Sequence, residues 1–228
     1  MFESEEAARA AVLDTARALA PLGLNHGSAG NVSLRWHRGG SDGFLITPSA
    51  LPYSACTLDD LVWMACPVTH TEGGEPLACG PRRPSSEWRF HHDLYRTRPE
   101  ITAVVHAHAP YCAALSCQPR VQREGLPAFH YMLAAAGGPD LRCAAYATFG
   151  TPTLSEAVLA AMTDRRACLM AHHGMIAVGA SLDAALALAV EVEWLARVYT
   201  LTLSLGPPAL LPEAEMDRVL DRFRDYRP

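Results

Sequence analysis

Two histidines separated by one residue, His106 and His108, end an apolar run that begins at Ile101. Side chains of a strand alternate between its two faces, so residues two apart point the same way, about 7 Å apart along the chain. At that separation both imidazoles can bind one metal ion. A His-x-His pair also occurs among exposed or core histidines, but this one ends a strand just before Pro110, where functional groups often lie. Spacing and position together indicate a metal site.

Two other stretches offer further ligands. Glu87 stands where a helix is expected to begin, so its carboxylate is either a first-turn acid stabilised by the helix dipole or a metal ligand. His172 and His173 follow the expected strand 167–171, and because neighbouring residues face opposite sides, only one of them can join the pair. The adjacent Gly174 favours His173. Three imidazoles and one carboxylate form an ordinary set of zinc ligands.

Short loops of small and hydroxyl-bearing residues could bind an anion through backbone N–H groups and hydroxyls. Each loop alone is more typical of a turn or a helix cap. They predict an anion site only if the fold brings them together. They are Gly30-Asn31, Thr47-Pro48-Ser49-Ala50 and Ser85-Ser86.

The elements that must position these groups follow from periodicity and from start and stop signals. Expected helices span 5–22, 84–98, 110–117, 153–163, 182–203 and 213–226. Expected strands span 32–36, 43–47, 61–66, 101–107 and 167–171. Thr57 with Asp60, and Thr153 with Glu156, have the spacing of capping pairs. The polar stretch 69–84 is expected to be a surface connection, and residues 1–228 are expected to form a single α/β domain.

Composition excludes several classes of protein. The 228 residues carry 19 Lys and Arg against 24 Asp and Glu, a net charge of -5, so no basic field exists to bind nucleic acid or an anionic membrane. The 7 cysteines contain no C-x-x-C pair, which is typical of reduced thiols. With an acidic N-terminus and no long apolar run, the sequence predicts a cytoplasmic protein.

Seven motifs, in order along nearly the whole chain, resemble the class II aldolase/adducin family. The ordered set is far more specific than any one motif. It consists of Gly27-Ser28-Ala29-Gly30-Asn31-Val32-Ser33, Ile46-Thr47-Pro48, Pro84-Ser85-Ser86-Glu87, Val104-Val105-His106-Ala107-His108, His130-Tyr131-Met132 with Ala135-Ala136-Gly137-Gly138, Tyr146-Ala147-Thr148-Phe149-Gly150 and His172-His173-Gly174.

The resemblance implies roles for particular residues. It implies that His106, His108 and His173 hold one zinc ion, with Glu87 as both fourth ligand and acid/base group. Tyr131 matches a tyrosine that reaches the active site of a neighbouring subunit and protonates the aldehyde oxygen. Residues implied to bind the substrate and its phosphate are Gly30, Asn31, Ser49, Ala50, Ser85, Ser86 and, in the C-terminal segment, Tyr226.

The implied fold is a three-layer sandwich, with a mostly antiparallel central sheet and helices on both faces. The implied assembly is a cyclic homotetramer with active sites at subunit interfaces. The implied activity, in carbohydrate metabolism, is retro-aldol cleavage of a ketose 1-phosphate resembling L-fuculose 1-phosphate, giving dihydroxyacetone phosphate and an aldehyde. Breaking that carbon–carbon bond leaves negative charge on the ketone half, which a divalent cation stabilises as a Lewis acid.

Other activities of the same family stay open. A related lyase could act on another deoxy-ketose or methylthio-ketose phosphate, or decarboxylate a sugar-acid phosphate, with the same metal and Glu87. A pentulose-phosphate 4-epimerase ranks lower, because that branch is not expected to use the Glu87 position as its acid/base glutamate. A non-catalytic adducin-like interaction domain would lack the metal set that this chain retains.

The chain departs from the family pattern in ways that bear on substrate choice. Ala50 stands where the related aldolases have glycine, and its Cβ would narrow the phosphate approach if that position has φ > 0. Ala107 replaces an asparagine, and a few extra residues lengthen 118–125. His91, one turn beyond Glu87, is a candidate partner of the metal site. The other histidines, His26, His37, His70, His92 and His130, are expected in loops or on solvated helix faces.

Overall fold

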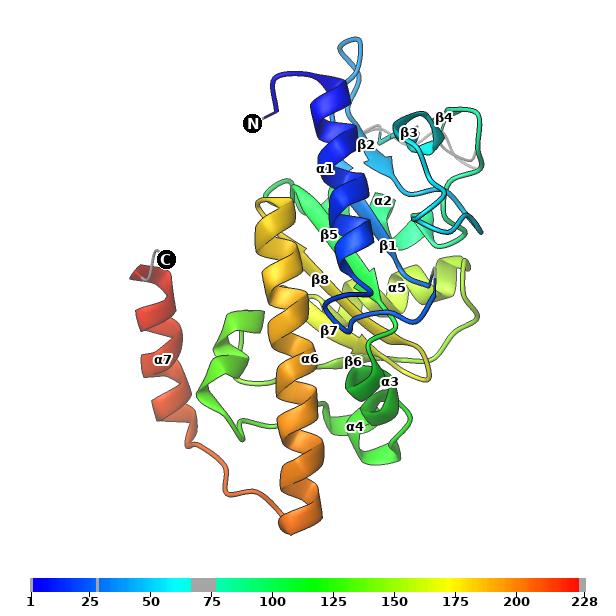
Figure 1. Ribbon diagram of the computed structural model, residues 1–228. Coiled ribbons are helices and arrows are strands. Elements are labelled where there is room, and N and C mark those ends of the chain that lie inside the picture. Colours follow the sequence, from blue (N-terminus) through cyan, green and yellow to red (C-terminus); the bar gives the residue numbers. More distant parts are fainter. Residues whose placement is uncertain (1, 28, 67–76, 226–228) are drawn as a thin grey trace.

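An eight-stranded sheet with helices on both faces forms the protein, shown in Figure 1. The computed structural model describes residues 2–27, 29–66 and 77–225. Along the sheet the strands lie in the order β4-β3-β2-β1-β5-β8-β7-β6. Their bounds are β1 Asn31–Arg35, β2 Gly43–Ile46, β3 Val62–Ala65, β4 Ala78–Cys79, β5 Ala103–Ala107, β6 Cys143–Ala144, β7 Ala167–Met170 and β8 Gly174–Gly179.

The sheet is mixed. Strand β6 pairs parallel with β7, whereas the other neighbouring strands pair antiparallel. The expected layered α/β class is therefore confirmed, and the expected antiparallel pairing fails at the β6 edge. The reason is that the chain crosses from β6 to β7 through a helix, and such a crossover returns the strand in the same direction.

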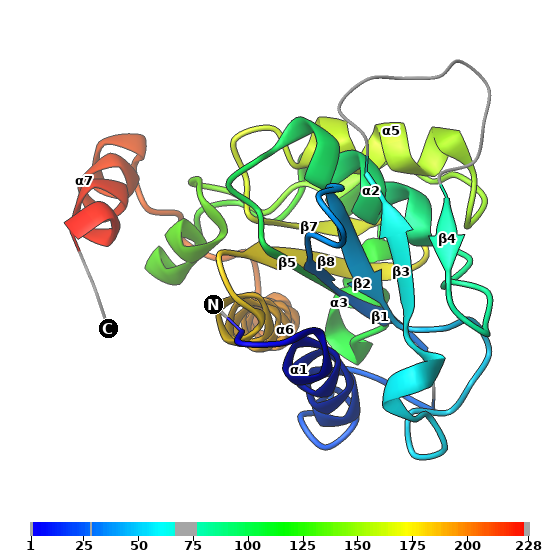
Figure 2. The same ribbon diagram turned by 90° about the horizontal axis from the view of Figure 1, so that it is seen from above.

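One face of the sheet is covered by α1 (Glu5–Ala18), α3 (Pro110–Ser116) and α6 (Leu182–Leu205). Figure 2 shows α1, α3 and α6 together beneath the strands. Alternate residues of β5, such as Val105, join the apolar core on this side. The largest part of the buried apolar surface lies here, and it fixes the plane of the central strands.

The opposite face is covered by α2 (Trp88–Thr97) and α5 (Pro152–Ala161), which contact each other. Val104 of β5 belongs to this second core together with Phe90 and Leu94 of α2. Because side chains alternate along a strand, His106 shares the face of Val104 and points toward α2. This alternation puts the first candidate ligand on the side of the sheet where Glu87 lies.

Smaller helices complete the chain. A 3-10 helix, η1, spans Leu58–Asp60, and another, η2, spans Tyr131–Ala136. Helix α4 (Pro119–Glu124) lies in the lengthened stretch after α3, and α7 (Glu213–Asp225) packs against η2 (Figure 1). Among the described residues, no helix is both long enough and apolar enough to cross a bilayer.

Several boundaries differ from the sequence prediction. Thr57 and Asp60 do form the expected capping box. The capping box expected at Thr153 and Glu156 is wrong, because α5 begins at Pro152 and its cap is Thr151, whose hydroxyl accepts from the Leu154 N–H. Proline at the first helical position places the cap two residues earlier than the Thr-x-x-Glu pattern suggests. Within the expected connection 69–84, residues 69–76 lie outside the described part, and Ala78–Cys79 form β4.

Candidate active site

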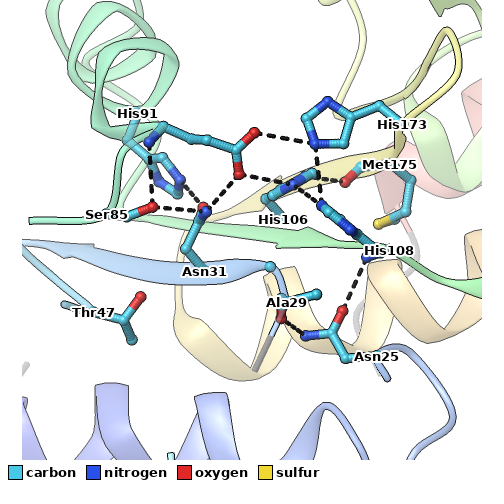
Figure 3. A network of polar contacts seen from close by, with 12 residues as sticks. Asn25, Ala29, Asn31, Thr47, Ser85, His91, His106, His108, His173 and Met175 are labelled. Carbon is cyan, nitrogen blue, oxygen red and sulfur yellow. Dashed lines mark hydrogen bonds and ion pairs between the residues drawn. The ribbon is translucent and has the colours of Figure 1, made fainter. Parts of the chain in front are cut away.

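The side chains of Glu87, His106, His108 and His173 meet at one end of the central strands, as Figure 3 shows for the three histidines. One ligand atom from each lies within 4.8 Å of all the others. The Nε2 atom of His108 is 3.1 Å from Nε2 of His106 and 3.0 Å from Nε2 of His173. Glu87 lies 3.2 Å from His106 and 3.0 Å from His173. The structure thus brings together the four residues predicted as metal ligands.

Strand pairing explains this convergence. His106 is the last residue but one of β5, and His108 follows directly after that strand. His173 lies in the tight turn between β7 and β8, and β8 pairs with β5. Glu87 occupies the residue before α2, where its side chain makes no capping bond and is free to face the histidines. The first-turn reading of Glu87 therefore does not describe its side chain.

The donor set fits a divalent cation such as zinc. His106 Nδ1 lies 2.8 Å from the backbone oxygen of Met175, which can only accept, so Nδ1 carries the proton and Nε2 presents a lone pair. Glu87 Oε1 is buried and accepts no hydrogen bond. Ligands of a tetrahedral zinc ion lie about 3.3 Å apart, close to the separations found here. An orphaned carboxylate oxygen facing imidazole nitrogens is the arrangement that a bound cation would satisfy.

The electrostatics of the cluster favour the ionised form of Glu87 and the neutral form of His108. Burial alone would raise the pKa of Glu87, but His106 and His173 beside it hold that pKa well below its usual range. Burial, together with the charge of His106 and His173, lowers the pKa of His108 to about 4. A carboxylate and a neutral imidazole are the forms that bind a metal ion.

Side chains of neighbouring elements hold the backbone around His108 through hydrogen bonds. Asn25 Oδ1 accepts from the His108 N–H at 2.9 Å, and Asn25 Nδ2 donates to the Ala29 oxygen. Just beyond, Glu193 of α6 accepts from the N–H groups of Tyr111 and Cys112 at 2.9 Å each, which caps α3. Carboxylate bonds to free N–H groups at a helix start are stronger than neutral ones. His108 therefore lies between two segments, each held by hydrogen bonds: one by Asn25 and the other by Glu193.

A cavity of about 390 Å³ opens beside the cluster. Its wall includes Glu87, His108 and His173 together with the predicted anion loops. The residues from those loops are Gly30, Asn31, Ser49, Ala50, Ser85 and Ser86. The sequence predicted an anion site only if the fold brings these loops together. They do come together, because loops far apart in the chain line one cavity next to the candidate metal ligands.

Two contacts hold the loops against each other. The Ser49 N–H donates to the Arg83 oxygen and the Ser85 N–H donates to the Thr47 oxygen, both at 3.0 Å. Gly30 has φ +77° and lies so near the His106 backbone oxygen that a Cβ would stand 2.5 Å from it. Ala50 has φ 56°, in the left-handed region. A positive φ was the condition under which its Cβ would narrow the approach of a phosphate, and that condition is met.

Comparison with known proteins gives the same family. The model of the Class II Aldolase and Adducin N-terminal domain matches residues 10–200. The 5-methylthioribulose-1-phosphate/5-deoxyribulose-1-phosphate aldolase of Rhodospirillum rubrum is 51% identical over 98% of this chain and 94% of its own. The L-fuculose phosphate aldolase of Escherichia coli K12 is 45% identical over 94% of this chain and 93% of its own.

The chain belongs to the class II aldolase and adducin family. A solved L-fuculose 1-phosphate aldolase superposes with a TM-score of 0.83 at 36% identity, covering 95% of each chain. Both curated relatives are aldolases, and they cover almost the whole chain. This member of the family is therefore an enzyme, a carbon–carbon lyase.

Tyr131, which the resemblance assigned to the substrate, does not line this cavity. Tyr131 lies in η2 with 51% of its surface exposed, and it is stacked on His130. Its hydroxyl has no place in the wall of the cavity of its own chain. Tyr226 lies outside the described residues.

Sequence reasoning also missed residues of this class II aldolase site. Tyr146, Ala147, Phe149 and His172 line the cavity, although only their motif was noted. His91 and His92 are buried, so the solvated position expected for His92 is wrong. The i, i+4 spacing from Glu87 was the available signal for His91. No local pattern reveals that a loop such as 145–150 faces the cavity.

The metal-free class II aldolase should lose stability as the pH falls from 7 to 5. Burial lowers the pKa of His91 to about 3 and that of His108 to about 4, whereas both have the ordinary value of 6.5 when unfolded. Below pH 6.5 the unfolded chain binds protons that the folded chain does not, so the free energy of unfolding falls with pH until the folded values are reached. Thermal unfolding of chelator-treated protein at pH 7, 6 and 5 measures this. An unchanged melting temperature would contradict the burial of these two rings.

Proposed function

We propose that this protein is a zinc-dependent aldehyde-lyase that cleaves a ketose 1-phosphate to dihydroxyacetone phosphate and an aldehyde. The observation that carries the proposal is the cluster of four donors, Glu87, His106, His108 and His173. All of them except His106 line a cavity that the predicted anion loops also line. A phosphorylated sugar needs both features. A cation near the carbonyl and hydroxyl oxygens would supply Lewis-acid stabilisation of the charge left on the ketone half.

Glu87 is the acid/base group in this proposal. In the condensation direction its carboxylate removes the proton from the carbon beside the ketone, and in cleavage it returns that proton. The low pKa of Glu87 keeps it ionised, and its Oε1 has no hydrogen bond to lose when it accepts a proton. Its Oε2 accepts from Asn31 at 3.0 Å and lies 3.2 Å from His106 Nε2, while its Oε1 lies 3.0 Å from His173 Nε2. These contacts suit a carboxylate that both binds a metal ion and exchanges a proton with the substrate.

The substrate phosphate would lie against the opposite wall. The hydroxyls of Ser49 and Ser86 and the groups of the Gly30 loop offer donors there, and the net acidity of the chain makes such local donors the main attraction for an anion. Ala50 adds a methyl group to this wall. Because this methyl group takes up space at the proposed phosphate site, unphosphorylated ketoses should be tested as well.

We further propose a cyclic homotetramer in which Tyr131 enters the cavity of a neighbouring subunit and exchanges the proton on the aldehyde oxygen. Tyr131 is half exposed and lies away from its own cavity. Trp194 of α6 is 46% exposed and packs edge-on to His130 beside it. Exposed aromatic side chains of this kind are typical of protein interfaces. Tyr226 would complete the neighbouring site from the C-terminal segment.

The aldehyde half of the substrate stays with two candidates. An L-fuculose 1-phosphate-like ketose is the first. A 5-deoxy or 5-methylthio ketose phosphate is the second, and it is favoured by the higher identity, 51% against 45%, to the relative named for such substrates. The retained metal ligands disfavour a non-catalytic adducin-like domain.

We also propose a single domain over 1–228, a cytoplasmic location and no nucleic-acid or membrane partner, from the net charge of -5 and the reduced-thiol composition.

A panel of ketose 1-phosphates tests the function directly. Zinc-loaded protein should release dihydroxyacetone phosphate from at least one of L-fuculose 1-phosphate, 5-deoxyribulose 1-phosphate and 5-methylthioribulose 1-phosphate, measured by a coupled assay. Matched unphosphorylated ketoses show whether the phosphate is required. Protein that binds one zinc per chain yet cleaves none of the panel would overturn the proposed substrate class, and protein without bound metal would favour the adducin-like reading.

Glu87→Gln should keep most of the zinc and lose roughly a hundredfold or more in turnover, because the amide cannot accept the proton. Glu156→Gln, on the exposed face of α5, is the matched control and should cleave at the parent rate. Turnover and zinc content measured on the same samples separate the two effects. A Glu87→Gln protein as fast as the parent would show that another group moves the proton.

Tyr131→Phe should slow cleavage and leave zinc content unchanged, because the hydroxyl serves the aldehyde oxygen and not the metal. Mixing Tyr131→Phe subunits with Glu87→Gln subunits should restore part of the activity, since some sites then combine an intact Glu87 with an intact Tyr131 from a neighbour. Steady-state rates of the re-associated mixture measure this. Loss of metal in Tyr131→Phe, or no recovery on mixing, would contradict the assigned role.

A further inference from the structure

A chain of buried polar groups runs behind Glu87. The Tyr95 hydroxyl lies 2.8 Å from Ser33 Oγ, and Ser33 Oγ lies 2.7 Å from His91 Nδ1. His91 Nε2 contacts Asn31 Oδ1, and Asn31 Nδ2 donates at 3.0 Å to Glu87 Oε2. Figure 3 shows His91 and Asn31 facing each other beside the histidine cluster. The chain ends on the proposed acid/base carboxylate.

The register of the sheet aligns this chain with the site. Asn31 of β1 is paired with His106 of β5, and Ser33 is paired with Val104, so both polar residues face α2. His91 lies on α2, one turn beyond Glu87, and it reaches down between them. Its ring is stacked on Phe90 with a centroid distance of 4.8 Å, which fixes the ring plane.

The groups that link Tyr95 to Glu87 are almost completely buried. Ser33 and His91 are 0% exposed and Asn31 is 2% exposed. Breaking one link would leave a buried donor or acceptor unpaired, which is unfavourable. A fully paired polar network inside an apolar layer therefore has one strongly favoured arrangement.

The direction of each hydrogen bond follows from the carboxylate. Glu87 is ionised and can only accept, so the Asn31 amide must turn its NH₂ group toward Glu87 and its oxygen toward His91. His91 must then donate from Nε2 and accept at Nδ1 from the Ser33 hydroxyl. Burial lowers the pKa of His91 to about 3, so the ring is neutral and holds a single proton at pH 7. Ser33 in turn accepts from Tyr95.

We propose that His91 is a positioning residue for Glu87, acting through Asn31. This rests on the proposed acid/base role of Glu87. The His91 Nε2–H fixes the Asn31 amide in one orientation, and that amide then holds Glu87 Oε2 beside His106. Without His91 the Asn31 side chain could rotate and present its oxygen to the carboxylate.

The same amide also reaches the anion loops. Asn31 Nδ2 donates at 3.0 Å to Ser85 Oγ, and Ser85 lines the cavity. Ser85 Oγ in turn accepts from the Glu87 N–H at 3.3 Å. A single oriented amide therefore sets the spacing between the acid/base carboxylate and the phosphate wall. A histidine that only filled the core would not require a hydrogen bond to the Asn31 amide.

Kinetics of matched variants test the role in the zinc-loaded enzyme. His91→Phe keeps a ring of similar size but cannot donate to Asn31, so kcat should fall roughly tenfold or more, the scale of lost outer-shell partners. KM should stay within about threefold, because the cavity wall is intact. His91→Gln restores a donor at similar reach, and it should recover most of kcat.

His92→Phe is the control for losing a buried histidine from α2. His92 contacts Trp88 and Asp93 and faces away from the cavity wall, so the variant should keep the parent kcat. Melting temperature and zinc content accompany each measurement. A His91→Phe protein that is folded, zinc-loaded and as fast as the parent would overturn the positioning role, as would equal losses in His91→Phe and His91→Gln.

A second measurement needs neither substrate nor a variant. In ¹⁵N-labelled metal-free protein at pH 7, long-range ¹H–¹⁵N correlation spectra should show His91 neutral and protonated at Nε2. A proton at Nδ1 instead would reverse the Asn31 amide and overturn the proposal. If the parent protein cleaves no sugar phosphate, the proposed function fails, whereas the tautomer result still decides the direction of the chain.

Discussion

Four potential metal ligands held close together at one end of the central strands are the constraint on which the structure depends. The Nε2 atoms of His106, His108 and His173 lie about as near one another as hydrogen-bonded atoms do, and Glu87 closes the group. Such an arrangement is unfavourable for the bare protein, because lone pairs face one another and a carboxylate oxygen is left unpaired. The surrounding sheet, with an apolar core on each face, is what prevents the cluster from relaxing.

The local parts of the site were readable from the sequence because each depends on short spacing. The period of two along 101–107 put His106 and the next histidine on one side, and Gly174 favoured the second of two adjacent histidines. The orientation of Glu87 was not readable. At a helix start, an acid that caps and an acid that turns into a cavity have the same local sequence, and only the position of α2 over β5 distinguishes them.

Long-range register explains what the sequence could not supply. Nothing near Asn31 indicates that it stands opposite His106, and nothing near Ser33 indicates that it meets His91. The strand β8, the edge strands and the parallel pairing of β6 were likewise missed, since short apolar runs carry little information about their partners. The error at α5 has a different cause, because a proline at the first helical position outweighed a Thr-x-x-Glu pattern. Family resemblance supplied the order of motifs, but not the buried groups behind them.

The pairing of Asn31 with His106 has a consequence for how the site is assembled. The first strand is made early in synthesis, whereas β5 and the turn that carries His173 follow much later, and loop closure over such separations is slow. A nascent chain therefore cannot capture the ion with high affinity until the middle of the sheet has closed. Metal uptake would then report completion of the sheet, and the bound ion would act as a lock on the finished fold rather than as a nucleus for it.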